Sequence, residues 1–165
     1  MNQDRRTFLL TAGAVAVSAL GARALFAQQG QQGLPAMTVY KSPSCGCCVE
    51  WVKHVRAAGF TVREVNTDDL GAVKREMGLP PRLASCHTAV VGSYVVEGHV
   101  PADDVKRMLR DRPAGVRGLA VPGMPVGSPG MEQGPPSGYE RYDVIAFTAA
   151  GATSVFASHG PPVRR

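Results

Sequence analysis

Three of the four cysteines of this chain lie within four consecutive residues, Cys45-Gly46-Cys47-Cys48. They separate a short run of β-forming residues, 37–41, from a segment in which Cys48, Trp51 and Val55 recur at helical spacing. This order predicts thiols at the amino end of a helix that follows a strand. The helix dipole and the free backbone N–H groups at that position favour the thiolate over the thiol.

The pattern of strands and helices continues beyond the cysteines. The predicted strands are 37–41, 60–65, 88–91 and 94–97, the last two joined by a Gly92-Ser93 turn. The predicted helices run from Ser44, a candidate N-cap, to Gly59, from Leu70 to Gly78, and onward from Pro101. The order β-α-β-α-β-β-α is that of the thioredoxin and glutaredoxin fold. An α/β sheet with helices on both faces is therefore expected, its first two strands parallel.

The segment after residue 112 differs in composition. Residues 113–138 are rich in Gly and Pro, yet they carry apolar residues and two methionines, Met124 and Met131. We expect an ordered loop lying over the domain. Residues 142–147 and 153–157 are strand-like and predict a C-terminal β-hairpin. A single metal-binding domain then spans 37–159, with 37–112 as its core and 113–159 as an extension.

The amino-terminal segment, 1–27, has the features of a twin-arginine signal peptide: Arg5-Arg6, then an apolar run too short to span a bilayer comfortably. An uncleaved anchor is the alternative. Export would deliver the chain to the periplasm with no stable membrane anchor after cleavage. A flexible linker is expected at 28–36 and a disordered tail at 160–165.

The charge pattern excludes one class of partner. Removing residues 1–27 takes away three arginines and one aspartate, which lowers the net charge from +5 to +3. The remaining charges are mixed along the chain without a long basic run. We therefore expect no nucleic-acid binding.

The cysteine cluster allows several chemistries. Cys45 and Cys48 have the spacing of redox motifs, but exchange needs only two thiols, and Cys47 would invite scrambling. Adjacent cysteines seldom close on one tetrahedral ion, so several ions bridged by thiolates are favoured over a single zinc. Soft thiolate selects Cu(I), with zinc as the second choice. Two structural disulfides remain the alternative in an oxidising compartment.

The fourth cysteine stands next to a histidine, in Cys86-His87. In the expected topology the loop before the third strand faces the cysteines of the first helix. We therefore expect Cys86 and His87 to complete a site with Cys45 and its neighbours. His99, at the start of the third helix, is either a cap or a ligand. Met124 and Met131 are soft thioethers that either join the site or anchor their loop.

Four motifs resemble the CopG-like family of periplasmic copper-resistance proteins, long described as a domain of unknown function. In chain order they are Cys45-Gly46-Cys47-Cys48, residues 83–89, residues 98–102, and residues 121–125 with 127–132. The resemblance spans roughly residues 37–159. It implies a thioredoxin-like fold that binds a Cu(I) cluster through Cys45, Cys47, Cys48 and Cys86, with His87, Met124 and Met131 near the metal.

Three functions follow as hypotheses. The first is a copper-binding protein that holds more than one Cu(I) in copper resistance, with or without cycling between Cu(I) and Cu(II). The second is a thiol–disulfide oxidoreductase that uses Cys45 and Cys48. The third is a chaperone that passes copper to a copper-handling or electron-transfer partner. The sequence does not decide whether the chain is an enzyme.

Overall fold

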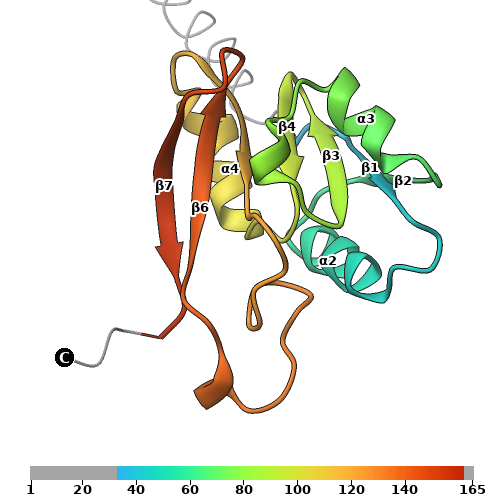
Figure 1. Cartoon of the computed structure of the whole chain (residues 1–165), viewed down its shortest axis with the longest axis vertical. Coiled ribbons are helices and arrows are strands. Elements are labelled where there is room, and N and C mark those ends of the chain that lie inside the picture. The colour runs from blue at the N-terminus through green and yellow to red at the C-terminus, as the bar shows by residue number, and fades with distance from the viewer. Residues whose placement is uncertain (1–32, 162–165) are drawn as a thin grey trace, which may run out of the picture. The chain divides into compact units, whose positions relative to one another are not determined.

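The computed structural model describes residues 33–161, and those from Leu34 onward belong to the second of two compact units, Leu34–Arg165 (Figure 1). The predicted signal peptide, residues 28–32 of the predicted linker and residues 162–165 of the predicted tail lie outside the described residues. Seven strands are described: β1 (Met37–Lys41), β2 (Val62–Asn66), β3 (His87–Val91), β4 (Tyr94–Glu97), β5 (Val116–Ala120), β6 (Tyr142–Thr148) and β7 (Thr153–His159). The helices are α2 (Gly46–Ala57), α3 (Leu70–Glu76) and α4 (Ala102–Asp111), with short 3-10 turns η2 (Pro81–Leu83) and η3 (Pro136–Gly138).

The strands form one sheet in the order β2-β1-β3-β4-β5-β6-β7. β1 is parallel to β2 and antiparallel to β3, and β3 pairs with β4 as a hairpin. The element order up to α4 is the predicted β-α-β-α-β-β-α. The parallel pair and the hairpin arise as expected, because a helix connects the first pair and a two-residue turn the second.

Helices cover both faces of the sheet, as predicted, because successive strand residues point to opposite sides. The core cluster under α2 and α4 includes Val39, Trp51, Val52, Val55, Val96, Val105, Met108 and Leu119. A second, smaller cluster lies on the other face, where α3 packs against β1 and β3, and it consists of Leu79, Leu83, Val95, Ala120 and Phe147. The neighbours Val95 and Val96 thus belong to different clusters.

The extension is more regular than expected. The predicted loop 113–138 contains a strand, β5, which pairs in parallel with β4 and antiparallel with β6. The prediction of a loop throughout was therefore wrong for 116–120, because it rested on the Gly- and Pro-rich composition of the whole segment. A side chain at Gly118 would meet the Val95 carbonyl oxygen at 2.0 Å, so only glycine permits this close strand pairing.

Other boundaries agree closely with the expectations. The C-terminal hairpin forms as β6 and β7. Helix α2 begins at Gly46 with Cys45 as its N-cap, rather than the expected Ser44. Leu34, within the predicted linker, packs against the core. Within residues 33–161 we find no helix of the length and hydrophobicity that a bilayer crossing requires.

The close approach at Gly118 generates a stability prediction. Gly118→Ala places a methyl group 2.0 Å from the Val95 carbonyl oxygen and 2.8 Å from the Phe147 ring. We expect the free energy of unfolding, measured by urea denaturation, to fall by about 3 kcal/mol, because the Val95 backbone and the Phe147 ring must both move. Gly138→Ala is the matched control, since its added methyl group meets no atom within 4 Å. Equal denaturation midpoints for the two variants would contradict the packing described here.

Candidate metal centre

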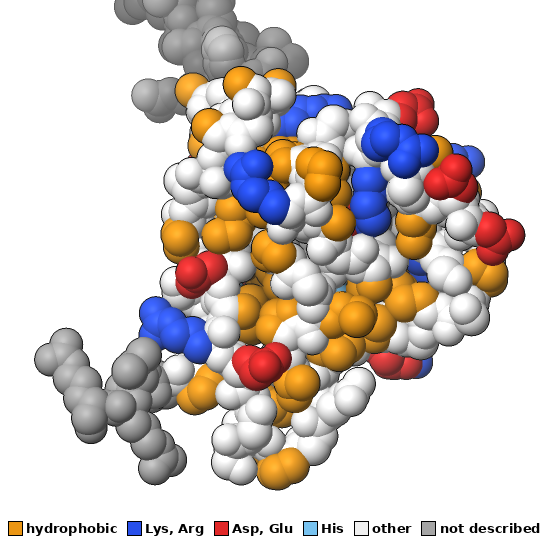
Figure 2. All heavy atoms as spheres, in the orientation of Figure 1, with side chains coloured by type: hydrophobic (Ala, Val, Ile, Leu, Met, Phe, Trp, Pro, Cys, Tyr) orange, Lys and Arg blue, Asp and Glu red, His pale blue; other side chains and the backbone are white. Residues whose placement is uncertain are grey.

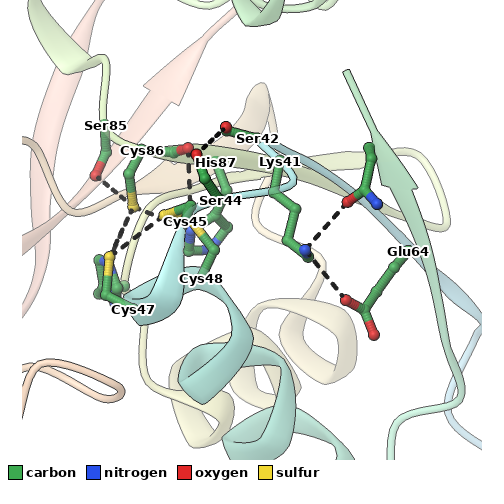
Figure 3. Close-up of a disulfide and its surroundings, with 12 residues drawn as sticks. Lys41, Ser42, Ser44, Cys45, Cys47, Cys48, Glu64, Ser85, Cys86 and His87 are labelled. Atoms are coloured by element: carbon green, nitrogen blue, oxygen red, sulfur yellow. Dashed lines mark hydrogen bonds and ion pairs between the residues drawn. A yellow bond between two sulfur atoms is a disulfide. The ribbon is translucent and has the colours of Figure 1, made fainter. Parts of the chain in front are cut away.

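The first turn of α2 presents three sulfur atoms together (Figure 3). Cys45 is the N-cap residue and its side chain makes no capping hydrogen bond, while Cys47 and Cys48 lie within the first turn. Cys45 and Cys48 form a disulfide with Cα atoms 5.4 Å apart. Cys47 is free and half-buried. The structure thus differs from the alternative of two disulfides, because only one pair is joined among the described residues.

Cys86 faces this turn from the loop that precedes β3 (Figure 3). Its Sγ lies 3.9 Å from Cys47 Sγ, and its carbonyl oxygen lies 3.6 Å from Cys48 Sγ. Cys47 Sγ is in turn 3.5 Å from Cys45 Sγ. All four sulfur atoms lie within 4.8 Å of one another. The expected meeting of Cys86 with the α2 cysteines is confirmed.

Two imidazole rings also lie close to the Cys86 sulfur atom. Cys86 Sγ lies 3.3 Å from His87 Nδ1 and 3.0 Å from His99 Nε2. Both histidines are fully buried. The His87 ring packs on Trp51 with centroids 4.4 Å apart and meets the His99 ring edge-on at 5.2 Å. Cys86 therefore belongs to two groups of candidate ligands, one of the four cysteines and one with His87 and His99.

His99 has a defined tautomer. Its Nδ1 lies 2.8 Å from the carbonyl oxygen of Pro129, which only accepts hydrogen bonds. Nδ1 therefore carries the proton, and the Nε2 lone pair points at Cys86 Sγ. His99 was left open between cap and ligand in the sequence. The glycine directly before His99 was the available sequence signal that this position is sterically restricted. In the structure Gly98 has φ +69°, and an added Cβ would meet Ser85 and the Val121 carbonyl oxygen.

Burial keeps these groups neutral. It lowers the pKa of His87 well below its ordinary value, and it lowers the pKa of His99. Burial, followed by the neighbouring Cys47, raises the pKa of Cys86 to about 12. In the absence of metal the Cys86 thiol therefore donates its proton to a neutral imidazole. A cation that replaces this proton would relieve the burial cost of a thiolate.

The segment between β5 and β6 lies over the start of α2. Gly130 packs so closely that an added Cβ would meet the Trp51 amide nitrogen at 2.6 Å and the Cys47 carbonyl oxygen at 2.9 Å. The prediction of an ordered loop over the domain is confirmed for this part. Met131 follows Gly130 and is buried, whereas Met124 is 51% exposed. Beside Cys47 the loop leaves a shallow cavity of about 430 Å³, lined by Gly46, Cys47, Glu50, Gly130, Glu132 and Gln133.

A buried ion pair holds the segment that carries Cys86. Glu97, at the end of β4, is fully buried, and its carboxylate lies 2.5 Å from Lys74 Nζ. The same carboxylate accepts hydrogen bonds from the Ser85 amide at 2.6 Å and the Thr88 hydroxyl at 2.6 Å. Ser85 and Thr88 flank Cys86-His87 on both sides. Glu97 thus fixes this segment relative to β4, whose next residues lead to His99.

The donor set fits a soft metal ion when the disulfide is reduced. Four thiolates within 4.8 Å of one another are close enough to share ions through bridging sulfurs. In the disulfide state Cys45 and Cys48 offer no thiolate, which leaves Cys47, Cys86 and the two imidazoles. The role of Met124 and Met131 as ligands stays a prediction.

Comparisons with known proteins agree with the cysteine motifs. Residues 83–131 match the family model "Protein of unknown function, DUF411". A solved structure described as copper resistance protein copG, form 1, is 43% identical, covers 79% of this chain and 100% of its own, and superposes with a TM-score of 0.72. Form 2 is 44% identical, covers 78% and 99%, and has a TM-score of 0.72. Among curated proteins, none matches this chain.

The buried ion pair gives a second prediction. Lys74→Met leaves the Glu97 carboxylate buried without its cation. We expect the free energy of unfolding to fall by about 3 kcal/mol at pH 8. Burial raises the pKa of Glu97, and removing Lys74 removes the largest opposing influence. The folded variant then binds the Glu97 proton more tightly than the unfolded chain, so its free energy of unfolding falls as the pH rises above about 4.5. The variant is therefore expected to lose less stability, relative to the parent chain, at pH 5 than at pH 8.

Denaturation of matched variants at both pH values tests this prediction. Lys53→Met is the control, because Lys53 pairs with Glu50 on the surface and both side chains are more than half exposed. We expect its effect to stay within about 0.5 kcal/mol. Adding Glu97→Gln to Lys74→Met should restore part of the loss, since no charge remains buried. Equal losses for the Lys53 and Lys74 variants would contradict a structural role of the buried pair.

Proposed function

Because this chain belongs to the CopG-like family of copper resistance proteins, we propose that it binds copper as Cu(I) on the thiolates of Cys45, Cys47, Cys48 and Cys86. The observation that carries the proposal is the meeting of these four sulfur atoms within 4.8 Å, although Cys86 is 38 residues beyond Cys48. A role in copper resistance and homeostasis follows from this binding.

The arrangement favours several ions over one. Cys47 and Cys48 are adjacent in the chain, and Cys47 Sγ is turned toward Cys86 while Cys48 is buried under the turn. Thiolates that point from different sides into one small space bridge ions more readily than they enclose a single one. Thiolate ligands select Cu(I) over harder ions, and zinc, which prefers four separate ligands around one centre, is the less favoured metal.

The nitrogen and thioether donors have supporting roles in this proposal. His87 adjoins Cys86 and adds a ligand at the edge of the cluster. Met131 is buried in the loop that packs on α2, which suits a thioether ligand or a wall that excludes water. Met124 is exposed and suits capture of an incoming ion. The cavity beside Cys47 is the route by which ions would enter.

The order β2-β1-β3-β4, with cysteines at the start of the first helix, supports a thioredoxin-like core adapted to hold metal. We infer one metal-binding domain over 37–159 and a twin-arginine signal over 1–27, which would place the mature chain in the periplasm. The thioredoxin-like assignment also explains why a redox-type pair, Cys45 and Cys48, lies inside the metal site.

The Cys45–Cys48 disulfide favours a second candidate function, thiol–disulfide exchange. Reduction of this bond takes two electrons and two protons from a partner dithiol. The same pair also suits redox cycling of copper: two Cu(II) ions each accept one electron, the two thiols become a disulfide, and two protons are released. Delivery of Cu(I) to a partner protein is a further candidate, supported by the opening beside Cys47.

Anaerobic titration tests the metal function. We expect the fully reduced chain to bind more than one Cu(I) against a competing chelator, because four thiolates can share ions. Cys47→Ser should remove most of this binding, since Cys47 lies between Cys45 and Cys86. Ser44→Ala is the control, as its exposed hydroxyl pairs with the Ser42 hydroxyl on the surface. A stoichiometry of one or zero, or full binding by Cys47→Ser, would contradict the proposed cluster.

An insulin-reduction assay distinguishes the second candidate. We expect the metal-free chain to turn over insulin poorly, because Cys47 lies 3.5 Å from Cys45 Sγ and competes in exchange. Robust turnover that survives Cys47→Ser and is lost in Cys45→Ser would instead make thiol–disulfide exchange the better description of this protein.

A further inference from the structure

We propose that His54 is a positioning residue: as a neutral imidazole it attaches the start of α4 to α2, and it thereby holds His99 beside Cys86. The proposal rests on the proposed copper function for the ion that the centre holds. It goes beyond that function because it makes the geometry of the centre depend on the protonation of a side chain that lies outside it.

Two side chains of α2 contact the backbone between His99 and α4. Trp51 Nε1 donates a hydrogen bond to the Val100 carbonyl oxygen at 2.9 Å. His54 Nε2 accepts a hydrogen bond from the Ala102 amide at 3.1 Å. Trp51 and His54 are three residues apart in the helix, so they project from the same face of α2. That face therefore fixes a carbonyl group and an amide group of the segment that follows His99.

The contact with His54 satisfies an amide that α4 itself cannot satisfy. The first amides of a helix have no carbonyl group of a preceding turn to bind. The N-cap residue of α4, Pro101, makes no side-chain capping hydrogen bond, and its carbonyl oxygen accepts from Asp104 and Val105 instead. Ala102 is buried. His54, from a different helix, thus supplies the acceptor for the Ala102 amide.

The start of α4 decides where His99 lies. The His99 ring is held by its own contacts, with Nε2 3.0 Å from Cys86 Sγ and Nδ1 2.8 Å from the Pro129 carbonyl oxygen. The backbone that carries this ring continues directly into the segment that α2 holds. Detachment of Ala102 from His54 would therefore let the His99 backbone move away from Cys86 and would admit water to the thiol.

Only a neutral His54 ring can make this contact. Because Nε2 accepts, the proton lies on Nδ1, and protonation would turn Nε2 into a donor that faces the Ala102 donor. It would also place a positive charge at the amino end of α4, where the helix dipole is positive. Burial lowers the pKa of His54. The carboxylates of Glu132, from the segment between β5 and β6, and of Asp103, from α4, oppose this effect, and Lys106 of α4 adds to it.

Acid is therefore expected to open the contact. With the start of α4 detached, His54 titrates near its ordinary pKa of 6.5, whereas the buried ring of the attached form binds a proton less readily. The detached form binds more protons below that pH, so detachment becomes more favourable as the pH falls. The contact is complete above about pH 7 and weakens progressively at lower pH. The centre would then lose metal in acid more readily than protonation of its thiolates alone would cause.

Hydrogen exchange of the Ala102 amide reports this contact in the metal-free chain. We expect the protection factor of the parent chain to fall by about fivefold between pH 7.5 and pH 5. His54→Gln keeps an acceptor that does not titrate, so its protection factor should stay nearly constant. His54→Phe keeps a ring without an acceptor and should show low protection at both pH values. Lys53→Gln removes an exposed charge from the adjacent position and should behave like the parent.

Alkylation of the Cys86 thiol tests the effect on the centre, again without metal. Peptide mass spectrometry separates Cys86 from Cys47, which is also free. Burial raises the pKa of Cys86 to about 12, so water that reaches the thiol should speed its alkylation. At pH 7.5 we expect alkylation about fivefold faster in His54→Phe, the factor for one lost hydrogen bond. His54→Gln and Lys53→Gln should react at the parent rate.

Three results would each overturn the proposal. The first is equal protection of Ala102 in the parent and in His54→Phe, shown to be folded by circular dichroism. The second is alkylation of Cys86 in His54→Phe at the parent rate. The third is the same pH dependence of Ala102 protection in the parent and in His54→Gln.

Cu(I) titration of the reduced chains distinguishes this proposal from the proposed function. His54→Phe that binds the parental number of Cu(I) ions about fivefold more weakly would support both. Parental affinity in His54→Phe would overturn the positioning role and leave the cluster intact. A parent chain that binds no Cu(I) would contradict the proposed function, and the two metal-free measurements would then decide the role of His54.

Discussion

The buried carboxylate of Glu97 binds the Ser85 amide, the Thr88 hydroxyl and the Lys74 ammonium at once. These contacts hold the Cys86-His87 segment at the end of the sheet, against the first turn of α2. They add to the pairing of His87 with Lys41 in the sheet and to the hydrogen bond that the Gly98 amide donates to the His87 carbonyl. A buried ion pair contributes little net stability, but it fixes a geometry, because any displacement leaves a charge unpaired.

That geometry places the Cys86 sulfur atom close both to the three cysteines at the start of α2 and to two buried histidine rings. The segment between β5 and β6 covers the site, because Gly130 packs on the backbone of α2 and the Pro129 carbonyl orients His99. This segment forms the lower part of the surface in Figure 2. The helix end favours thiolates, whereas burial disfavours them. The balance suits a site in which bound cations, rather than solvent, stabilise the charge.

The fold could be predicted well where local signals are strong. The βαβ unit, the hairpin and α4 follow from hydrophobic periodicity and from the glycines that end each element. Strand β5 could not be predicted, because its glycine signals a break locally and becomes favourable only beside the Val95 backbone and the Phe147 ring. At the site, all four cysteines and His87 were identified as candidates. The role of His99, as a cap or a ligand, was left undecided, because its neighbours in space are far away in the chain.

The sequence by itself determined which donors this protein has and that three thiols lie at one helix start, since spacing along a helix is a local property. It also predicted that Cys86 would meet them, because the order of strands and helices permits few topologies. Only the tertiary structure decided that Cys45 and Cys48 are the joined pair, that Cys47 stays free, and that His99 faces Cys86. Those outcomes depend on distances between segments that are packed by the core and by the Glu97 ion pair, and no local pattern encodes them.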